Sequence, residues 1–109
     1  MSLTPQQIFE EKIATRLTNN PSVAEKINAS YQFELTGDGG GSWAVDLTKK
    51  ADFVVPGTIE NPKVTITMTA KDFVDLVEGR LNGQMAFMTG KLKLKGDMSL
   101  ALKLQQILG

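Results

Sequence analysis

The chain has 109 residues, of which 41% are hydrophobic and 22% charged, and its formal net charge is zero. This composition is typical of one globular domain with a core of its own, and no overall field would attract nucleic acid. Cysteine and histidine are both absent, which excludes disulfides, thiol catalysis, the commonest general base and the commonest metal ligand. No apolar run approaches the ~20 residues of a membrane-spanning helix, and the start lacks the apolar core of a signal peptide. We therefore expect a single intracellular domain over residues 1–109.

The chain begins with signals for a helix. Thr4 is suited to the N-cap, Pro5 to the first helical position, and Gln7 to the third, where it completes a capping box. One apolar face then follows at helical spacing, formed by Ile8, Phe9, Ile13 and Leu17. Asn19, Asn20 and Pro21 end this helix, and residues 21–27 predict a short second one.

A hairpin comes next, because the apolar period changes to two. Residues 31–35 alternate as Tyr31, Phe33 and Leu35 against polar neighbours, and residues 43–47 repeat the pattern. Between them lies the glycine-rich stretch 36–41 (TGDGGG). A phosphate-binding loop would need a following Lys-Ser/Thr and a helix, whereas this stretch leads into a strand. It predicts a hairpin tip.

Residues 48–62 carry the weakest pattern, with a short edge strand predicted at 51–55 and turns at 56–57 and 61–62. A strand follows at 64–68. Thr69 then caps a helix that Gly79 ends. Residues 82–83 form a turn, 84–88 a helical turn or two, and 91–95 (KLKLK) a strand with its lysines on one face. Asp97 caps a final helix that extends towards Leu108.

These elements predict an α+β fold. The strands alternate cleanly, so one face of the sheet is buried under the helices and the other faces solvent. We expect no catalytic activity, since the carboxylates have the spacing of a solvated face and no serine has a recognisable base. We also expect no cofactor and no metal. We expect no nucleic acid either, because no aromatic residue interleaves Lys91, Lys93 and Lys95 to stack bases.

The C-terminal third is richer in apolar residues than one buried stripe requires. It also contains three of the five methionines, whose flexible side chains suit varied apolar partners. Three interpretations remain open on the residues alone: a tight core, the wall of a cavity, or a surface that docks a partner helix.

Several stretches of the chain resemble the sterol carrier protein 2 family of intracellular lipid-binding domains. They are residues 43–47 (WAVDL), 65–68 (TITM), 72–73 (DF), Gly79, and, without a gap, the segment 84–105 (QMAFMTGKLKLKGDMSLALKLQ). The resemblance covers essentially the whole chain except 48–62. It implies a five-stranded, mainly antiparallel sheet with one face covered by about five helices, and an apolar tunnel between the layers.

The resemblance also implies a function and a site. Family members are non-catalytic carriers of fatty acids, acyl-CoA, phospholipids or sterols, and the matching wall residues would be Trp43, Val77, Leu94, Leu104 and Gln105. Gln105 would offer a hydrogen bond to a lipid head group or carboxylate. The full candidate lipid-binding set adds apolar residues on the same faces: Phe33, Met68, Phe73, Leu81, Met85, Phe87, Met88, Leu92, Met98, Leu100, Ala101 and Leu108.

Partners and location follow as expectations. The ligand is a long-chain fatty acid, acyl-CoA or another lipid, and the protein is a monomer. Residues 79–109 carry a net charge of +4, which favours transient contact with acidic membranes. The family resemblance indicates the peroxisome, although the sequence ends in Ile107-Leu108-Gly109 rather than a targeting tripeptide, and the alternative is the cytoplasm. The alternative function is a protein-interaction module that uses the apolar C-terminal helix surface.

Overall fold

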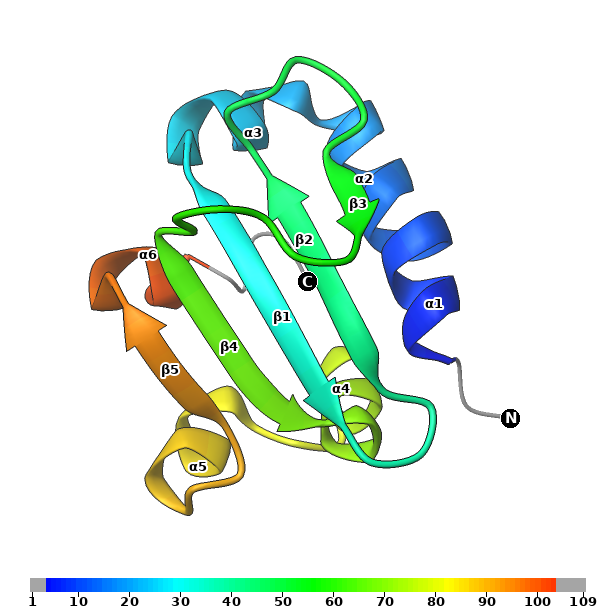
Figure 1. Ribbon diagram of the computed structural model, residues 1–109, viewed down its shortest axis with the longest axis vertical. Coiled ribbons are helices and arrows are strands. Elements are labelled where there is room, and N and C mark those ends of the chain that lie inside the picture. The colour runs from blue at the N-terminus through cyan, green and yellow to red at the C-terminus, as the bar shows by residue number, and fades with distance from the viewer. Residues whose placement is uncertain (1–3, 104–109) are drawn as a thin grey trace.

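A five-stranded sheet with helices on one face forms the domain (Figure 1). The computed structural model describes residues 4–103. The elements are, in chain order, α1 (Pro5–Gln7), the π-helical segment η1 (Ile8–Ile13), α2 (Ala14–Asn19), α3 (Pro21–Ile27), β1 (Ser30–Thr36), β2 (Gly41–Asp46), β3 (Val54–Pro56), β4 (Val64–Thr69), α4 (Ala70–Val77), α5 (Gly83–Met88), β5 (Lys93–Gly96) and α6 (Met98–Leu102). The predicted α+β class is confirmed.

The N-terminal helical run α1–η1–α2 begins as the sequence predicts. The Thr4 side chain accepts a hydrogen bond from the Gln7 amide, and the Gln7 side chain accepts one from the Thr4 amide. Ile8, Phe9 and Ile13 are buried in η1. A π-helical turn widens the spacing of side chains and is found mostly as short interruptions of α-helices. Here it occupies the segment that carries Phe9.

The strands lie in the order β3-β2-β1-β4-β5. β1 pairs with β2 and β2 with β3 in antiparallel fashion, and β4 with β5 likewise, so the sheet is mainly antiparallel. β1 and β4 are parallel, with Phe33 beside Ile66. Tyr31, Phe33 and Ile66 point to the helical side and are buried, which confirms the predicted alternation.

The outer face of the sheet differs from the expectation of a solvated surface. The chain between β3 and β4 crosses this face in front of β2 and β1 (Figure 1). Gln32 and Ala44, predicted to face solvent, are both buried there. The Gln32 amide nitrogen donates to the Gly57 carbonyl at 3.0 Å, and its amide oxygen accepts from the Ile59 amide at 2.9 Å. This crossover explains why residues 57–62 carried no strand pattern.

Thr69 and Asp97 act as the predicted caps, and Asn82, predicted as part of a turn, caps α5 as well. The side chains of Thr69, Asn82 and Asp97 accept hydrogen bonds from the first turns of α4, α5 and α6 respectively. β5 begins at Lys93 rather than residue 91, because the amides of Lys91 and Leu92 both donate to the Ala86 carbonyl and close α5 instead. α6 has Lys103 as its C-cap, so the part of the predicted final helix beyond it lies outside the described residues.

Candidate functional site

An aromatic cluster lies at the centre of the inner face of the sheet. Phe9 stacks on Trp43 and on Phe73 with ring centroids 5.1 and 5.0 Å apart, and meets Phe33 edge to face at 5.1 Å. Phe33 also contacts Phe73 edge to face at 5.8 Å. Such pairs stabilise a fold by about 0.5–1.5 kcal/mol each beyond the area they bury. The cluster therefore fixes the N-terminal helix, β1, β2 and α4 to one another.

The candidate lipid-binding residues form three groups by exposure. Four are buried within the core: Phe33, Met68, Phe73 and Leu92. A second group is partly buried and packs against that core, and it comprises Trp43, Val77, Leu81, Leu94, Leu100 and Ala101. The first two groups are contiguous, because they belong to one hydrophobic cluster between the sheet and the helices.

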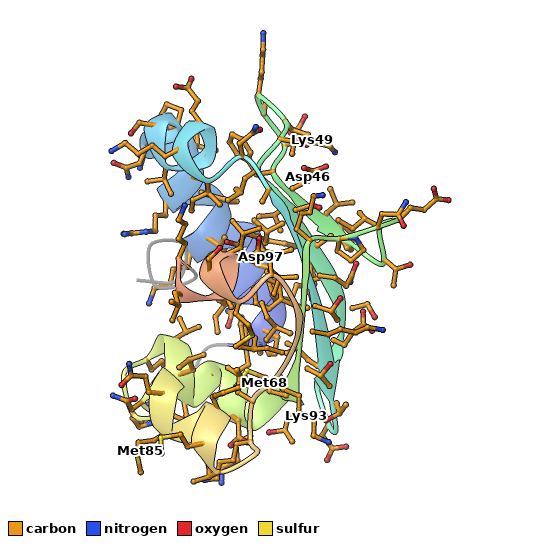
Figure 2. The ribbon with its side chains drawn as sticks, turned by 90° about the vertical axis from the view of Figure 1, so that its left-hand side faces the viewer. Asp46, Lys49, Met68, Met85, Lys93 and Asp97 are labelled. Atoms are coloured by element: carbon orange, nitrogen blue, oxygen red, sulfur yellow. The ribbon has the colours of Figure 1, made fainter. Side chains whose placement is uncertain are left out.

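The third group is exposed. It consists of Met85, Phe87 and Met88 on α5 and Met98 on α6, with Met88 at 78% of its full exposure. Ala86 is the one fully buried residue of α5, so the helix is anchored by a small side chain while its large apolar side chains face outward. Figure 2 shows Met85 pointing away from the sheet, on the helical side of the molecule. Large exposed apolar side chains grouped in this way mark interaction or ligand sites.

Leu104, Gln105 and Leu108 complete the candidate set and lie outside the described residues. The expectation that Gln105 is a polar group in an apolar wall therefore stays a prediction.

Three further residues belong to this region although the sequence analysis did not assign them to the site. Phe9 was recognised as part of an apolar helical face, but nothing in the sequence indicated that it would contact Phe33, Trp43 and Phe73 together. Leu76 on α4 packs against the core, and Leu102 on α6 is 77% exposed. Leu102 lies four residues after Met98, on the same side of α6. This helical spacing was the signal in the sequence that could have assigned Leu102 to the site.

Tyr31 connects the sheet to α6. Its side chain is fully buried, and its hydroxyl donates a hydrogen bond to the Leu100 carbonyl at 2.6 Å, across 69 positions of sequence. Burial, and secondly the negative charge of Asp97, raise the pKa of Tyr31 to about 12. The hydroxyl therefore keeps its proton, and remains a donor, throughout the physiological range of pH.

The charged residues surround the apolar region rather than enter it. Lys91, Lys93 and Lys95 are exposed, as predicted, and Figure 2 shows Lys93 on the sheet side of the molecule, opposite Met85. Arg80 forms ion pairs with Asp75 at 2.8 Å and Glu78 at 2.7 Å, so its charge is compensated locally. Within residues 4–103, no group of three acidic side chains could hold a metal ion.

A depression lies on the exposed side of the N-terminal helical run, lined by Gln7, Glu11, Lys12, Thr15, Arg16 and Asn20. Each of the six lining side chains ends in a polar or charged group, so the depression lacks the mostly hydrophobic wall of a typical lipid pocket. Among the described residues, no helix is both long and apolar enough to cross a membrane.

Comparison with known proteins agrees with this architecture. Hydroxysteroid dehydrogenase-like protein 2 of Homo sapiens is 44% identical over 87 residues, which cover 79% of this chain and 21% of that protein. Peroxisomal multifunctional enzyme A of Dictyostelium discoideum is 40% identical over 100 residues, covering 85% of this chain and 23% of that protein. The chain thus spans about a fifth of the length of these curated relatives.

A solved structure covers nearly the whole chain. The solution NMR structure of palmitated SCP2L2 from Aedes aegypti has a TM-score of 0.76 and 28% sequence identity, and the similarity covers 99% of this chain and 95% of that one. A model of the SCP-2 sterol transfer family matches residues 10–109. The family model, the fold and the resemblance noted in the sequence therefore agree: the chain belongs to the SCP-2 sterol transfer family.

Proposed function

We propose that the chain is a non-catalytic lipid carrier domain, which binds one long acyl chain between the inner face of the sheet and helices α4–α6. The observation that carries this proposal is that α5 and α6 expose large apolar side chains, among them Met88 and Leu102, while Leu100 and Ala101 of α6 pack partly against the core. The family supports it, since one relative's structure is described as palmitated.

The proposed wall is the full candidate set. Trp43, Val77, Leu81, Leu94, Leu100 and Ala101 would line the apolar space, with the buried Phe33, Met68, Phe73 and Leu92 behind them. Met85, Phe87, Met88 and Met98 would surround its entrance. Leu104, Gln105 and Leu108 would close it, with Gln105 hydrogen-bonding a carboxylate or head group.

Hydrocarbon burial supplies enough free energy for such binding. Each buried methylene contributes about 0.8 kcal/mol, so a chain of ~16 carbons contributes ~12 kcal/mol before the costs of ordering and association. Micromolar affinity requires about 8 kcal/mol. Because contacts between hydrocarbon groups are not directional, the domain would accept fatty acids, acyl-CoA, phospholipids or sterols with little discrimination.

Transfer would require contact with a donor or acceptor membrane. The exposed apolar side chains of α5 are suited to insert among acyl chains. The backbone amide of Lys91 donates a hydrogen bond to the Ala86 carbonyl, which fixes Lys91 beside α5, and its charged side chain is suited to contact an acidic head group. Transfer from vesicles rich in phosphatidylserine should therefore slow as salt is raised. A transfer rate that salt leaves unchanged would argue against acidic head groups as the partner.

The location we propose is the peroxisome, supported by the name of the Dictyostelium relative, and the cytoplasm is the alternative. The aligned part of the relatives is about a fifth of their length, so the dehydrogenase and multifunctional names describe proteins much larger than this domain. We propose that this domain itself catalyses no reaction and needs no cofactor.

A fluorescent fatty acid, cis-parinarate, tests the proposal directly. The delipidated protein should bind it saturably, and palmitate should displace it in a one-to-one ratio. Leu94→Arg should abolish binding, because the partly buried Leu94 faces the core cluster, while Lys93→Ala on the outward face of the same strand should bind normally. Absence of saturable binding to the folded wild-type protein would overturn the proposal. Mass spectrometry of lipid that co-purifies with the protein would identify a natural ligand.

The alternative function is a protein-interaction module. The same exposed apolar side chains of α5 and α6 favour it, since they would also suit a partner helix. Sedimentation of the delipidated protein separates the two functions. A carrier should remain a monomer at all concentrations, whereas self-association that rises with concentration would favour the module.

A further inference from the structure

α6 is held to the domain by few contacts. It has five residues, none of their side chains is buried, Met98 is nearly half exposed, and Leu102 is largely exposed. Leu100 and Ala101 pack only partly against the core. A short helix with so little buried area has a low free energy of local opening. What holds α6 in place therefore decides how often the lipid site proposed beneath it opens.

Two hydrogen bonds attach the α6 region to the sheet. At its start, the Asp97 amide donates to the Lys63 carbonyl at 3.0 Å, directly after Gly96 pairs with Val64 of β4. Further along, the Leu100 carbonyl accepts from the buried Tyr31 hydroxyl at 2.6 Å. The first bond continues the β4–β5 ladder and acts as a hinge. The second joins the helix to the centre of the sheet.

The Tyr31 bond is suited to open and close. The Leu100 carbonyl also accepts from the Lys103 amide at 3.1 Å, so it keeps one partner when the tyrosine bond is broken. The hydroxyl, in contrast, sits on a ring with no exposed surface. Breaking the bond leaves a buried donor unsatisfied, which disfavours the open state.

We propose that the Tyr31 hydroxyl is a latch on α6, and that it sets the rate at which an acyl ligand enters and leaves without contacting the ligand itself. The inference rests on the proposed function and names a positioning residue within it. The latch as proposed requires that the free and the liganded domain form the same bond. Its loss should therefore favour opening equally in both, and speed entry and exit together.

Tyr31→Phe tests the latch because it removes one oxygen atom and keeps the ring. From the usual contribution of a hydrogen bond, we expect the association and dissociation rates of cis-parinarate to rise together by roughly five-fold, with the dissociation constant unchanged. A residue that merely shaped the wall would instead change the dissociation constant. A control is Thr89→Val, which removes a hydroxyl bond to the Met85 carbonyl at 2.8 Å within the α5 turn and should alter neither rate.

Hydrogen exchange provides a test that needs no ligand. The Ala101 amide, bonded to the Asp97 carbonyl at 3.1 Å, should exchange about five-fold faster in Tyr31→Phe than in the wild type, while core amides of β1 are unchanged. Unchanged exchange at Ala101 would overturn the latch even if the domain binds lipid. Faster exchange in a domain that fails to bind cis-parinarate would overturn the carrier function and leave the latch on α6 established. Faster exchange with unchanged ligand rates would overturn the role of the latch in lipid entry.

Discussion

The ring of Phe9 lies nearly parallel to the indole of Trp43, with an interplanar angle of 10° and centroids 5.1 Å apart. This contact joins the π-helical segment η1 to β2, and the same phenyl ring stacks on Phe73 of α4. Trp43 is the sole tryptophan of the chain, so its fluorescence emission is a probe of the packing of the aromatic cluster.

Phe9→Leu should destabilise the domain by about 1–3 kcal/mol, because it keeps much of the side-chain volume but loses three aromatic contacts. Urea unfolding followed by Trp43 emission measures the change. Phe87→Leu is the matched control, since Phe87 is nearly half exposed, and it should alter stability by less than about 0.5 kcal/mol. Equal effects at the two positions would show that the cluster does not stabilise the fold.

Gln32→Ala should lower the free energy of unfolding by about 1–3 kcal/mol. The substitution deprives the Ile59 amide and the Gly57 carbonyl of the side-chain partners that hold the crossover on the outer face. Lipid binding should be unchanged, because Gln32 points away from the helical side. Gln6→Ala, at an exposed position of α1, is the control and should have little effect on denaturant unfolding. Loss of lipid binding at full stability would contradict this assignment.

Gly96→Ala should be among the most damaging single-methyl changes in the chain. Gly96 has a φ of +115°, and a β-carbon there would approach the Lys63 carbonyl oxygen far inside van der Waals contact. The pairing of β5 with β4, and with it the start of α6, should loosen. Gly83→Ala adds the same methyl group at the start of α5, in ordinary van der Waals contact with Leu76 at 3.7 Å, and should be neutral or mildly stabilising. Thermal unfolding of the pair provides the comparison.

The stability of the domain should fall in alkali through Tyr31. Its pKa is about 12 in the folded protein and near 10 in the unfolded chain. Between these two values the folded state keeps a proton that the unfolded state releases. The contribution of the Tyr31 hydroxyl to the stability of the fold is therefore fully present below pH 10 and is lost as pH rises towards 12. The free energy of unfolding of the wild type, measured by urea titration, should fall with pH in this window by about 2 kcal/mol more than that of Tyr31→Phe. Parallel curves would contradict the shift. The chain has one tyrosine, so ultraviolet absorbance of tyrosinate measures the pKa directly.

Local signals in the sequence predicted most of the fold. The predicted caps Thr4, Thr69 and Asp97 all lie where helices begin, because capping needs only a side chain and the next few amides. The strands of the hairpin followed from a period of two. The crossover at 57–63 could not be predicted in this way. Its contacts to Gln32 join residues 25 and 27 positions apart, and no local pattern encodes them.

The candidate site was predictable in kind but not in detail. Periodicity placed Leu94 and Phe73 on inward faces, and both belong to or pack against the core. Periodicity could not show that Phe73 is buried and Met88 exposed, since both are apolar residues at helical spacing. Which of them is covered depends on the neighbouring elements. Tyr31 shows the same limit, because the strand pattern identified its face but not the distant carbonyl that its hydroxyl reaches.

The single parallel pairing of β1 with β4 has a consequence for how the domain assembles. β1, β2 and β3 form one meander of neighbouring antiparallel strands, and β4 joins β5 as the second unit. The two units meet along β1 and β4, whose paired residues lie 33 positions apart, as Tyr31 and Val64 do. The β4–β5 pairs also lie 26 to 32 positions apart, so only the meander of β1, β2 and β3 is local in sequence, and we expect it to form before β4 and β5 join it. The inner face of the sheet, where the lipid is proposed to bind, is then complete only at the last step of folding.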